Sequence, residues 1–356
     1  MRVVRRFRLV LFLLAVAIVA CQPAPLRAPA TPTAVGQLQL GMNYVGWYAG
    51  AYRQDDSDRS LENLAATGTR WAAVVVTNYQ QQIGSTTIDR SGTRTPTDDD
   101  VTHAIATAHR LGLKVMLKPH LDLLNDPSHW RGQIGEEFLR PSDWASWFAS
   151  YDALILHEAD LARDNQVEQF CIGTELVGTS THEPEWRALV AQVRQHYPGK
   201  ITYAGNHDGE EQAIRWWDAL DFIGVDAYYP LTDQVHPTVA VLNQAWDRRG
   251  YVALLKALST HFGKRVIFTE IGYRAIANAA ADLSEWQNGG VPDVQTQANL
   301  YQAAIDTFGS LPWFGGFYWW AWPATARPIG GDAEWSPGGQ DAERILHAFN
   351  VRAVAE

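Results

Sequence analysis

The chain alternates regularly between strand-like and helix-like segments from about residue 39 to its C-terminus, and this alternation limits the fold more than any other feature. Short apolar, β-branched runs give way to longer segments in which apolar residues recur at helical spacing. The strand candidates are Leu40–Tyr44, Trp71–Thr77, Lys114–Pro119, Gln169–Thr174, Ile201–Ala204, Phe222–Ala227, Arg265–Thr269 and Gly316–Trp320. The helix candidates are Ser60–Ala66, Asp98–Leu111, Ser142–Asp164, Glu183–His196, Glu210–Leu220, Tyr251–Phe262, Val294–Phe308 and Asp341–Phe349.

Eight strands that are each followed by a helix predict an α/β fold of the (β/α)8 barrel (TIM barrel) type. A doubly wound sheet could use the same units, but its first strand usually leads into a glycine-rich phosphate-binding turn. The first strand here leads into Asn43-Tyr44-Val45-Gly46-Trp47, which lacks such a turn. We therefore expect one catalytic barrel over residues 37–353, with no second domain.

The first 36 residues are expected to lie outside the barrel. Residues 1–21 combine an arginine-rich start with an apolar run that ends at Cys21, which resembles a lipoprotein-type signal peptide. Lipidation of Cys21 would leave the Pro-, Ala- and Thr-rich residues 22–36 as a tether. This predicts an extracytoplasmic protein that is lipid-anchored to a bacterial membrane or secreted, and an ordinary signal peptide or a single N-terminal anchor is the alternative. The other cysteine, Cys171, is expected to be a buried apolar residue.

The composition indicates which partners are expected. The net charge of −10 argues against nucleic acid, because phosphate binding requires a basic face. The 15 Trp and 13 Tyr are an unusually large number, and although some belong to the core, flat aromatic faces also stack against sugar rings. We expect a polysaccharide or oligosaccharide substrate, membrane contact only through a lipid anchor, and a monomer.

Two glutamates stand at the ends of predicted strands. Glu175 follows Phe170-Cys171-Ile172-Gly173-Thr174, and Glu270 follows Val266-Ile267-Phe268-Thr269. A carboxylate at the end of a buried strand costs free energy, so a chemical role is a reason for its position. Paired carboxylates that face one pocket are what glycoside hydrolysis requires.

Other polar and aromatic residues also follow the predicted strands, at the barrel face where active sites of this fold are built. The candidates for substrate binding are Asn43, Tyr44, Trp47, Lys118, His120, Asn206, Tyr228, Trp320 and Trp322. Alternatives remain for some of these residues. His120 and Asp122 could support a loop, and Lys118 and Asp226 could form a structural ion pair. A zinc site from His120, His207 and Asp208 lacks the usual ligand spacing, so we expect no metal and no cofactor.

Several of these segments together resemble glycoside hydrolase family 113, the β-1,4-mannanases of clan A. The resembling segments are Gly41–Tyr44, Leu117–His120, Ile172–Leu176, Ile223–Pro230, Phe268–Arg274 and Trp319–Trp322. The resemblance implies a retaining mechanism with Glu270 as nucleophile and Glu175 as acid/base. It also implies that Tyr228 donates a hydrogen bond to Glu270 and that Trp320 lies under the sugar at the cleaved bond.

One position departs from the wider clan, which usually has Asn before the strand-four glutamate to bind the sugar 2-hydroxyl. This chain has Thr174 there, so the 2-hydroxyl contact must come from elsewhere or be weaker. The departure suits mannose, whose 2-hydroxyl is axial. The alternatives are another β-glycanase or β-glycosidase of the clan, and a surface lipoprotein that binds carbohydrate without cleaving it.

Overall fold

The computed structural model describes residues 38–90, 92–281, 290–325 and 335–355. The predicted signal segment, Cys21 and the tether lie outside the described residues. The described residues form one compact unit.

The centre of this unit is a closed barrel of eight parallel strands. Neighbouring strands pair in parallel from β2 round to β9, and β1 pairs with both β9 and β2, which closes the barrel. The strands are β1 (Gln39–Val45), β2 (Trp71–Gln80), β4 (Lys114–Leu123), β5 (Gln169–Thr174), β6 (Lys200–Asn206), β7 (Phe222–Asp226), β8 (Arg265–Ile271) and β9 (Phe314–Pro323). The two-residue strand β3 (Ile88–Asp89) adds to β2 in antiparallel orientation. The predicted (β/α)8 fold is confirmed.

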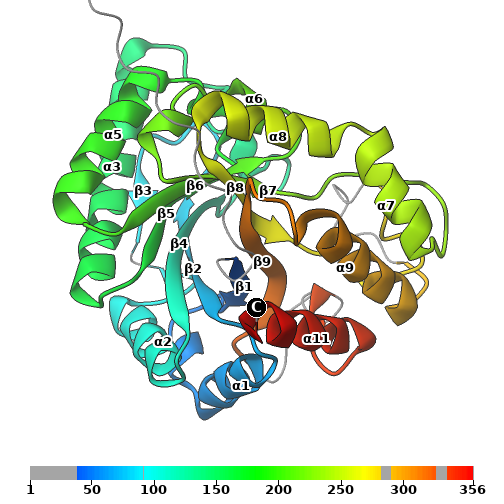
Figure 1. The fold of residues 1–356 in the computed structure, drawn as a ribbon. Helices are drawn as coiled ribbons and strands as arrows, with labels where there is room; N and C mark the ends of the chain where they lie inside the picture. Colours follow the sequence, from blue (N-terminus) through cyan, green and yellow to red (C-terminus); the bar gives the residue numbers. More distant parts are fainter. Residues whose placement is uncertain (1–37, 91, 282–289, 326–334, 356) are drawn as a thin grey trace, which may run out of the picture. The chain divides into compact units, whose positions relative to one another are not determined.

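Helices surround the barrel strands (Figure 1). They are α1 (Asp55–Ala66), α2 (Asp98–Arg110), α3 (Pro141–Asp164), α4 (Val177–Ser180), α5 (Glu183–His196), α6 (Glu210–Ala213), α7 (Val239–Arg248), α8 (Tyr251–Phe262), α9 (Val294–Phe308) and α11 (Asp341–Ala355). Three short 3-10 segments are η2 (Ala51–Arg53), η3 (Arg131–Gln133) and η4 (Trp217–Ala219).

The helices differ from the predicted set between β6 and β8. The predicted helix over 210–220 is only the single turn α6 followed by η4, because Ile214 is extended. Trp216 and Trp217 are fully buried there, and their indole N–H groups donate to Ser180 O and Glu211 O. Helix α7 was not predicted.

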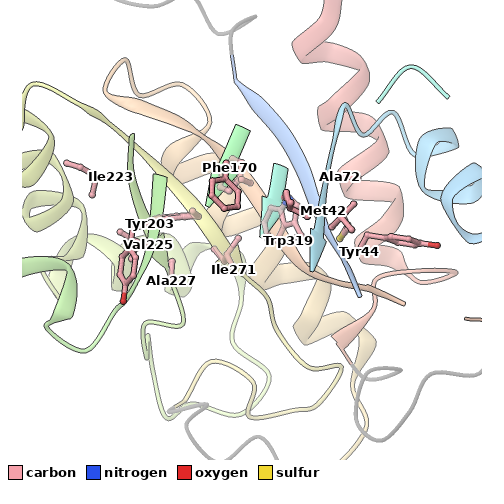
Figure 2. Close-up of a cluster of buried hydrophobic side chains, with 14 of the residues drawn as sticks. Met42, Tyr44, Ala72, Phe170, Tyr203, Ile223, Val225, Ala227, Ile271 and Trp319 are labelled. Atoms are coloured by element: carbon pink, nitrogen blue, oxygen red, sulfur yellow. The ribbon is translucent and has the colours of Figure 1, made fainter. Parts of the chain in front are cut away.

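The apolar core has an outer and an inner part, as the alternation of side chains along strands requires. The outer part lies between the strands and the helices, and Figure 2 shows a section of it with Met42 and Tyr44 of β1 and Trp319 of β9. Inside the barrel, Cys171 belongs to a buried layer with Met116 and Tyr318, so its predicted role as a buried apolar residue is confirmed. A second inner layer contains Val45, Val75, Ala321, Trp47 and Trp320.

Candidate active site

Glu175 begins the loop after β5, in a backbone conformation that non-glycine residues rarely adopt. Its φ is +54°, in the left-handed region, and its backbone N–H donates to Ala204 O (2.8 Å). Asn206 Nδ2 donates to Glu175 Oε1 (2.8 Å), and Arg131 Nη1 lies 3.5 Å from Glu175 Oε2. Strained backbone at a strand end is common at functional sites, where the surrounding contacts hold it.

Glu270, near the end of β8, is held by three side chains. Lys118 Nζ contacts Oε1, and His120 Nε2 lies 3.4 Å from the same oxygen. Tyr228 OH donates to Oε2 at 2.7 Å, which is the hydrogen bond that the sequence predicted. The carboxyl group of Glu270 therefore has a fixed orientation at the mouth of the barrel.

Lys118 and Asp226 complete a buried charged group beneath Glu270. Both side chains are fully buried, and Lys118 Nζ lies 3.5 Å from Asp226 Oδ1, so the ion pair considered from the sequence is present. Burial raises the pKa of Asp226 well above its ordinary value, and the nearby charge of Glu270 adds to the rise. The Lys118 ammonium therefore lies between two buried carboxyl groups, and its contact with Glu270 balances the charge of that residue.

The pKa values of the two strand-end glutamates are shifted in opposite directions. Burial alone would raise the pKa of Glu270, but the Lys118 ammonium and the contact with His120 hold it well below its ordinary value. Burial raises the pKa of Glu175; Arg131 opposes this rise and the charge of Glu270 adds to it. Glu270 is thus kept ionised, and the protonated form of Glu175 is favoured. Acid–base catalysis by two carboxyl groups requires such a difference between their pKa values.

His120 lies between Glu270 and two aromatic side chains, Trp320 and Trp47. Its ring stacks on Trp320 at 6.0 Å with an interplanar angle of 11°, and Trp47 lies 6.1 Å from Trp320. Burial lowers the pKa of His120 to about 4, so the imidazole is neutral. Arg131 Nη1 is 3.4 Å from His120 Nδ1 and can only donate, which places the ring proton on Nε2, towards Glu270. Trp47 and Trp320 are partly exposed, as sugar platforms need to be.

Three predicted substrate contacts are corrected by the positions of their side chains. Tyr44 points outward from β1, and its fully buried hydroxyl bonds to Ser57 between the barrel and α1. Trp322 belongs to the same outer core, and its indole N–H donates to Ser60 O (3.0 Å). Asn43 does point into the barrel, but its amide joins β1 to the carbonyls of Thr269 and Tyr318, and the side chain is fully buried.

Two residues near Glu175 were missed by the sequence analysis. Arg131, on η3, contacts Glu175, His120 and Asp122, so His120 and Asp122 are linked through this arginine. Glu210, on α6, accepts a hydrogen bond from the backbone of Asn206. Both residues belong to loop segments, where no periodic pattern marks a side chain that returns to the site. The Arg131–Gln133 segment carries no strand-end signal.

Thr174 cannot supply the 2-hydroxyl contact that an amide makes in the wider clan. Its side chain is fully buried, and the hydroxyl donates to Pro119 O at 3.4 Å. The polar group beside Glu270 is instead His120 Nε2, which lies 3.4 Å from Glu270 Oε1.

The described residues contain neither a metal-ligand cluster nor a helix that could span a membrane. Within them, no three His, Cys, Asp or Glu side chains come together as metal ligands, and His120, His207 and Asp208 do not form such a group. No helix in residues 38–90, 92–281, 290–325 and 335–355 has the length and apolar character needed to cross a bilayer.

The chain resembles known glycoside hydrolases in sequence and in structure. The family model for Glycoside Hydrolase Family 113 matches residues 43–334. A solved GH113 β-1,4-mannanase is 27% identical with a TM-score of 0.79, and the match covers 88% of this chain and 99% of that one. A GH113 β-mannanase from Alicyclobacillus acidocaldarius is 29% identical with a TM-score of 0.76, covering 89% and 98%.

More distant structures share the fold alone. A β-glucuronidase from Ruminococcus gnavus is 12% identical with a TM-score of 0.59, and the match covers 89% of this chain and 50% of the enzyme. No curated protein matches the chain in sequence.

Proposed function

The chain belongs to glycoside hydrolase family 113, and from this premise we propose that it cleaves β-1,4-linked mannan or manno-oligosaccharides with retention at the anomeric carbon. The observation that carries the proposal is that the pKa values of the two strand-end glutamates are shifted in opposite directions. Glu270 is held ionised by Lys118 and oriented by Tyr228, whereas burial favours the protonated form of Glu175. A nucleophile and a general acid in one site are the two groups that a retaining hydrolase needs.

In the first step, a carboxylate oxygen of Glu270 attacks the anomeric carbon. The bond from that carbon to the leaving-group oxygen breaks, and Glu175 transfers its proton to that oxygen. The product is a glycosyl-enzyme ester and the released sugar. Lys118, Tyr228 and His120 supply the orientation of Glu270, so no reorganisation of the nucleophile is needed at the moment of attack.

In the second step, Glu175 has become the base. It takes a proton from water, the water oxygen bonds to the anomeric carbon, and the ester bond to Glu270 breaks. Two inversions give net retention, and both glutamates return to their starting protonation states. This mechanism predicts that the two carboxyl groups work about 5–5.5 Å apart.

The preference for mannose is proposed to involve His120. Its Nε2–H is directed to the space beside Glu270 Oε1, where the 2-hydroxyl of a bound sugar lies when the neighbouring anomeric carbon is attacked. Hydrogen bonds to the 2-hydroxyl that strengthen in the transition state add several kcal/mol in glycosidases. Trp320, stacked on His120, offers the face under the same sugar, and Trp47 offers a neighbouring one.

The proposal is tested by substrate preference. Protein that lacks residues 1–21 is incubated with linear β-1,4-mannan, β-1,4-glucan and xylan, and new reducing ends are measured. Release from mannan is expected. Release from glucan or xylan alone would assign another β-glycanase activity, and release from none, with binding retained, would indicate a carbohydrate-binding protein.

The location of the protein is a separate proposal that depends on the N-terminal sequence. We propose that Cys21 is lipidated and anchors the barrel outside the cytoplasm through residues 22–36. In a bacterial host, the full chain should fractionate with membranes and incorporate labelled fatty acid, and Cys21→Ala should do neither. Labelling of the Cys21→Ala variant would refute the anchor.

A further inference from the structure

Glu175 depends on its neighbours for its position, because its backbone is in the left-handed region. Two contacts fix it from different sides. Asn206 Nδ2 holds the carboxyl oxygen Oε1, and the backbone N–H of the next residue, Leu176, donates to Tyr203 OH at 2.7 Å. The first contact sets the direction of the side chain, and the second sets the path of the chain that leaves it.

Both contacts lead to the same buried carboxyl group, that of Glu210. Its Oε1 accepts from Tyr203 OH (2.7 Å), and its Oε2 accepts from the backbone N–H of Asn206 (2.7 Å). Glu210 is only 2% exposed, so neither bond competes with solvent. A buried carboxyl group whose two oxygens both accept hydrogen bonds is held in one position and orients the groups that donate to it.

From this geometry we infer that Glu210 is a positioning residue for the acid/base Glu175, which it reaches through Asn206 on one side and Tyr203 on the other. The inference rests on the proposed hydrolase mechanism. Glu210 does not touch Glu175 itself, so its effect is on where the proton of Glu175 is delivered rather than on the chemistry of bond breaking.

The adjacent Glu211 provides a matched comparison on the same short helix. Glu211 is also fully buried, and burial raises the pKa of both residues to about 7. Its oxygens accept from Gly209 N (3.0 Å) and Tyr229 OH (3.3 Å), so it bonds to neither Asn206 nor Tyr203. Loss of a buried carboxyl group is therefore common to both positions, but the link to Glu175 belongs to Glu210.

The test compares leaving groups that need a proton with leaving groups that do not. Glu210→Leu, Glu210→Gln and Glu211→Leu are assayed by kcat/KM on β-mannobiosides of phenol and of 2,4-dinitrophenol, beside the wild type. Phenol needs the proton of Glu175 to depart, and dinitrophenol departs without it. Glu210→Gln retains an oxygen that can accept from Asn206 N–H, so it should restore part of the loss.

We expect Glu210→Leu to lower kcat/KM for the phenyl substrate by about 10- to 100-fold, since a misplacement of about 1 Å costs up to ~10²-fold. For the dinitrophenyl substrate the loss should be below about threefold, because no proton transfer is needed in that step. Glu211→Leu should affect both substrates equally. If Glu210→Leu does not fold, Tyr203→Phe removes one of the two links and gives the same comparison.

An equal loss on both substrates, or no loss on the phenyl substrate, would overturn the inference while leaving the hydrolase proposal intact. A wild-type enzyme that hydrolyses neither aryl mannobioside nor mannan would overturn the proposed function and this inference with it. Activity of the wild-type enzyme on these substrates therefore distinguishes failure of the inference from failure of the proposed function.

Discussion

Replacing Lys118 with Met should reveal how strongly the site holds Glu270, the proposed nucleophile, in its ionised form. Met is close to Lys in shape but is neutral, and Lys118 is fully buried against Glu270 and Asp226. Two unit charges about 3 Å apart at an effective dielectric of about 20 attract by roughly 5 kcal/mol, which corresponds to about 4 pKa units. Water that enters the site of the variant solvates the Glu270 carboxylate and replaces part of the lost attraction. We therefore expect the pKa of Glu270 to rise by at least about 2 units.

The assay is the pH dependence of kcat/KM on an aryl β-mannobioside, which reports the essential groups of the free enzyme. In the wild type the pKa of Glu270 is depressed, so activity should persist at acidic pH until the protein unfolds. In Lys118→Met, Glu270 takes up a proton at higher pH, so the acidic limb should move upward by about 2 units or more.

The matched control is Lys114→Met. Lys114 lies on the same strand, β4, but it is exposed at the opposite end and its ammonium lies over Trp71 at 5.5 Å. This variant should leave the acidic limb unchanged. An acidic limb of Lys118→Met that stays in place, or moves to lower pH, would refute the assigned role of Lys118.

Three further predictions concern the acid/base and a buried glutamate. Glu175→Ala should lower turnover of mannan by about 10²- to 10⁴-fold, and azide should partly restore turnover of a dinitrophenyl mannobioside; no rescue would argue against Glu175 as acid/base. Arg131→Gln should move the alkaline limb of kcat/KM to higher pH, because Arg131 opposes the rise in the pKa of Glu175; a downward shift would contradict this. Burial raises the pKa of Glu158 to about 7, so folding loses stability as pH rises from the ordinary Glu value towards 7. In urea unfolding, the free energy of unfolding of Glu158→Gln relative to that of the wild type should increase by roughly 3 kcal/mol from pH 4 to pH 8. A difference that stays constant across that range would contradict the raised pKa of Glu158.

The barrel could be predicted from the sequence because its strands and helices differ clearly in periodicity. Every barrel strand was found, although β2 and β4 run past their predicted ends, to Gln80 and Leu123. Helix α7 was not predicted, although Leu242, Ala245 and Trp246 are buried at helical spacing along it. The predicted helix over 210–220 failed because burial of two adjacent Trp side chains overrides local helical pattern.

The site was predicted where strand geometry determines it. Lys118 and Glu270 lie on β4 and β8, Glu175 and Tyr228 follow β5 and β7, and the four side chains meet at one end of the barrel. Tyr44 was misassigned although side chains alternate along a strand and Asn43 already points inward. Trp322 lies two residues after Trp320, so simple alternation would place both side chains on the same face of β9. The pairing of β1 with β9 shifts in register between Met42 and Tyr44, however, and Trp322 therefore points outward.

The residues that were missed reach the site from loops. Arg131 follows His120 by eleven positions and returns to it, and Glu210 acts through Asn206 and Tyr203. Such contacts depend on how a loop folds back over the barrel, which no local pattern of residues specifies.

Glu270 is proposed to form a covalent bond to the sugar while Glu175 exchanges the proton. A 2-deoxy-2-fluoro mannobioside with a dinitrophenyl leaving group should inactivate the enzyme, because the fluorine slows both steps and the reactive leaving group speeds only the formation of the glycosyl-enzyme. Mass spectrometry of the digested protein should then find the sugar on the peptide that contains Glu270. A sugar attached to any other residue, or turnover without an adduct and with an inverted product, would contradict the account.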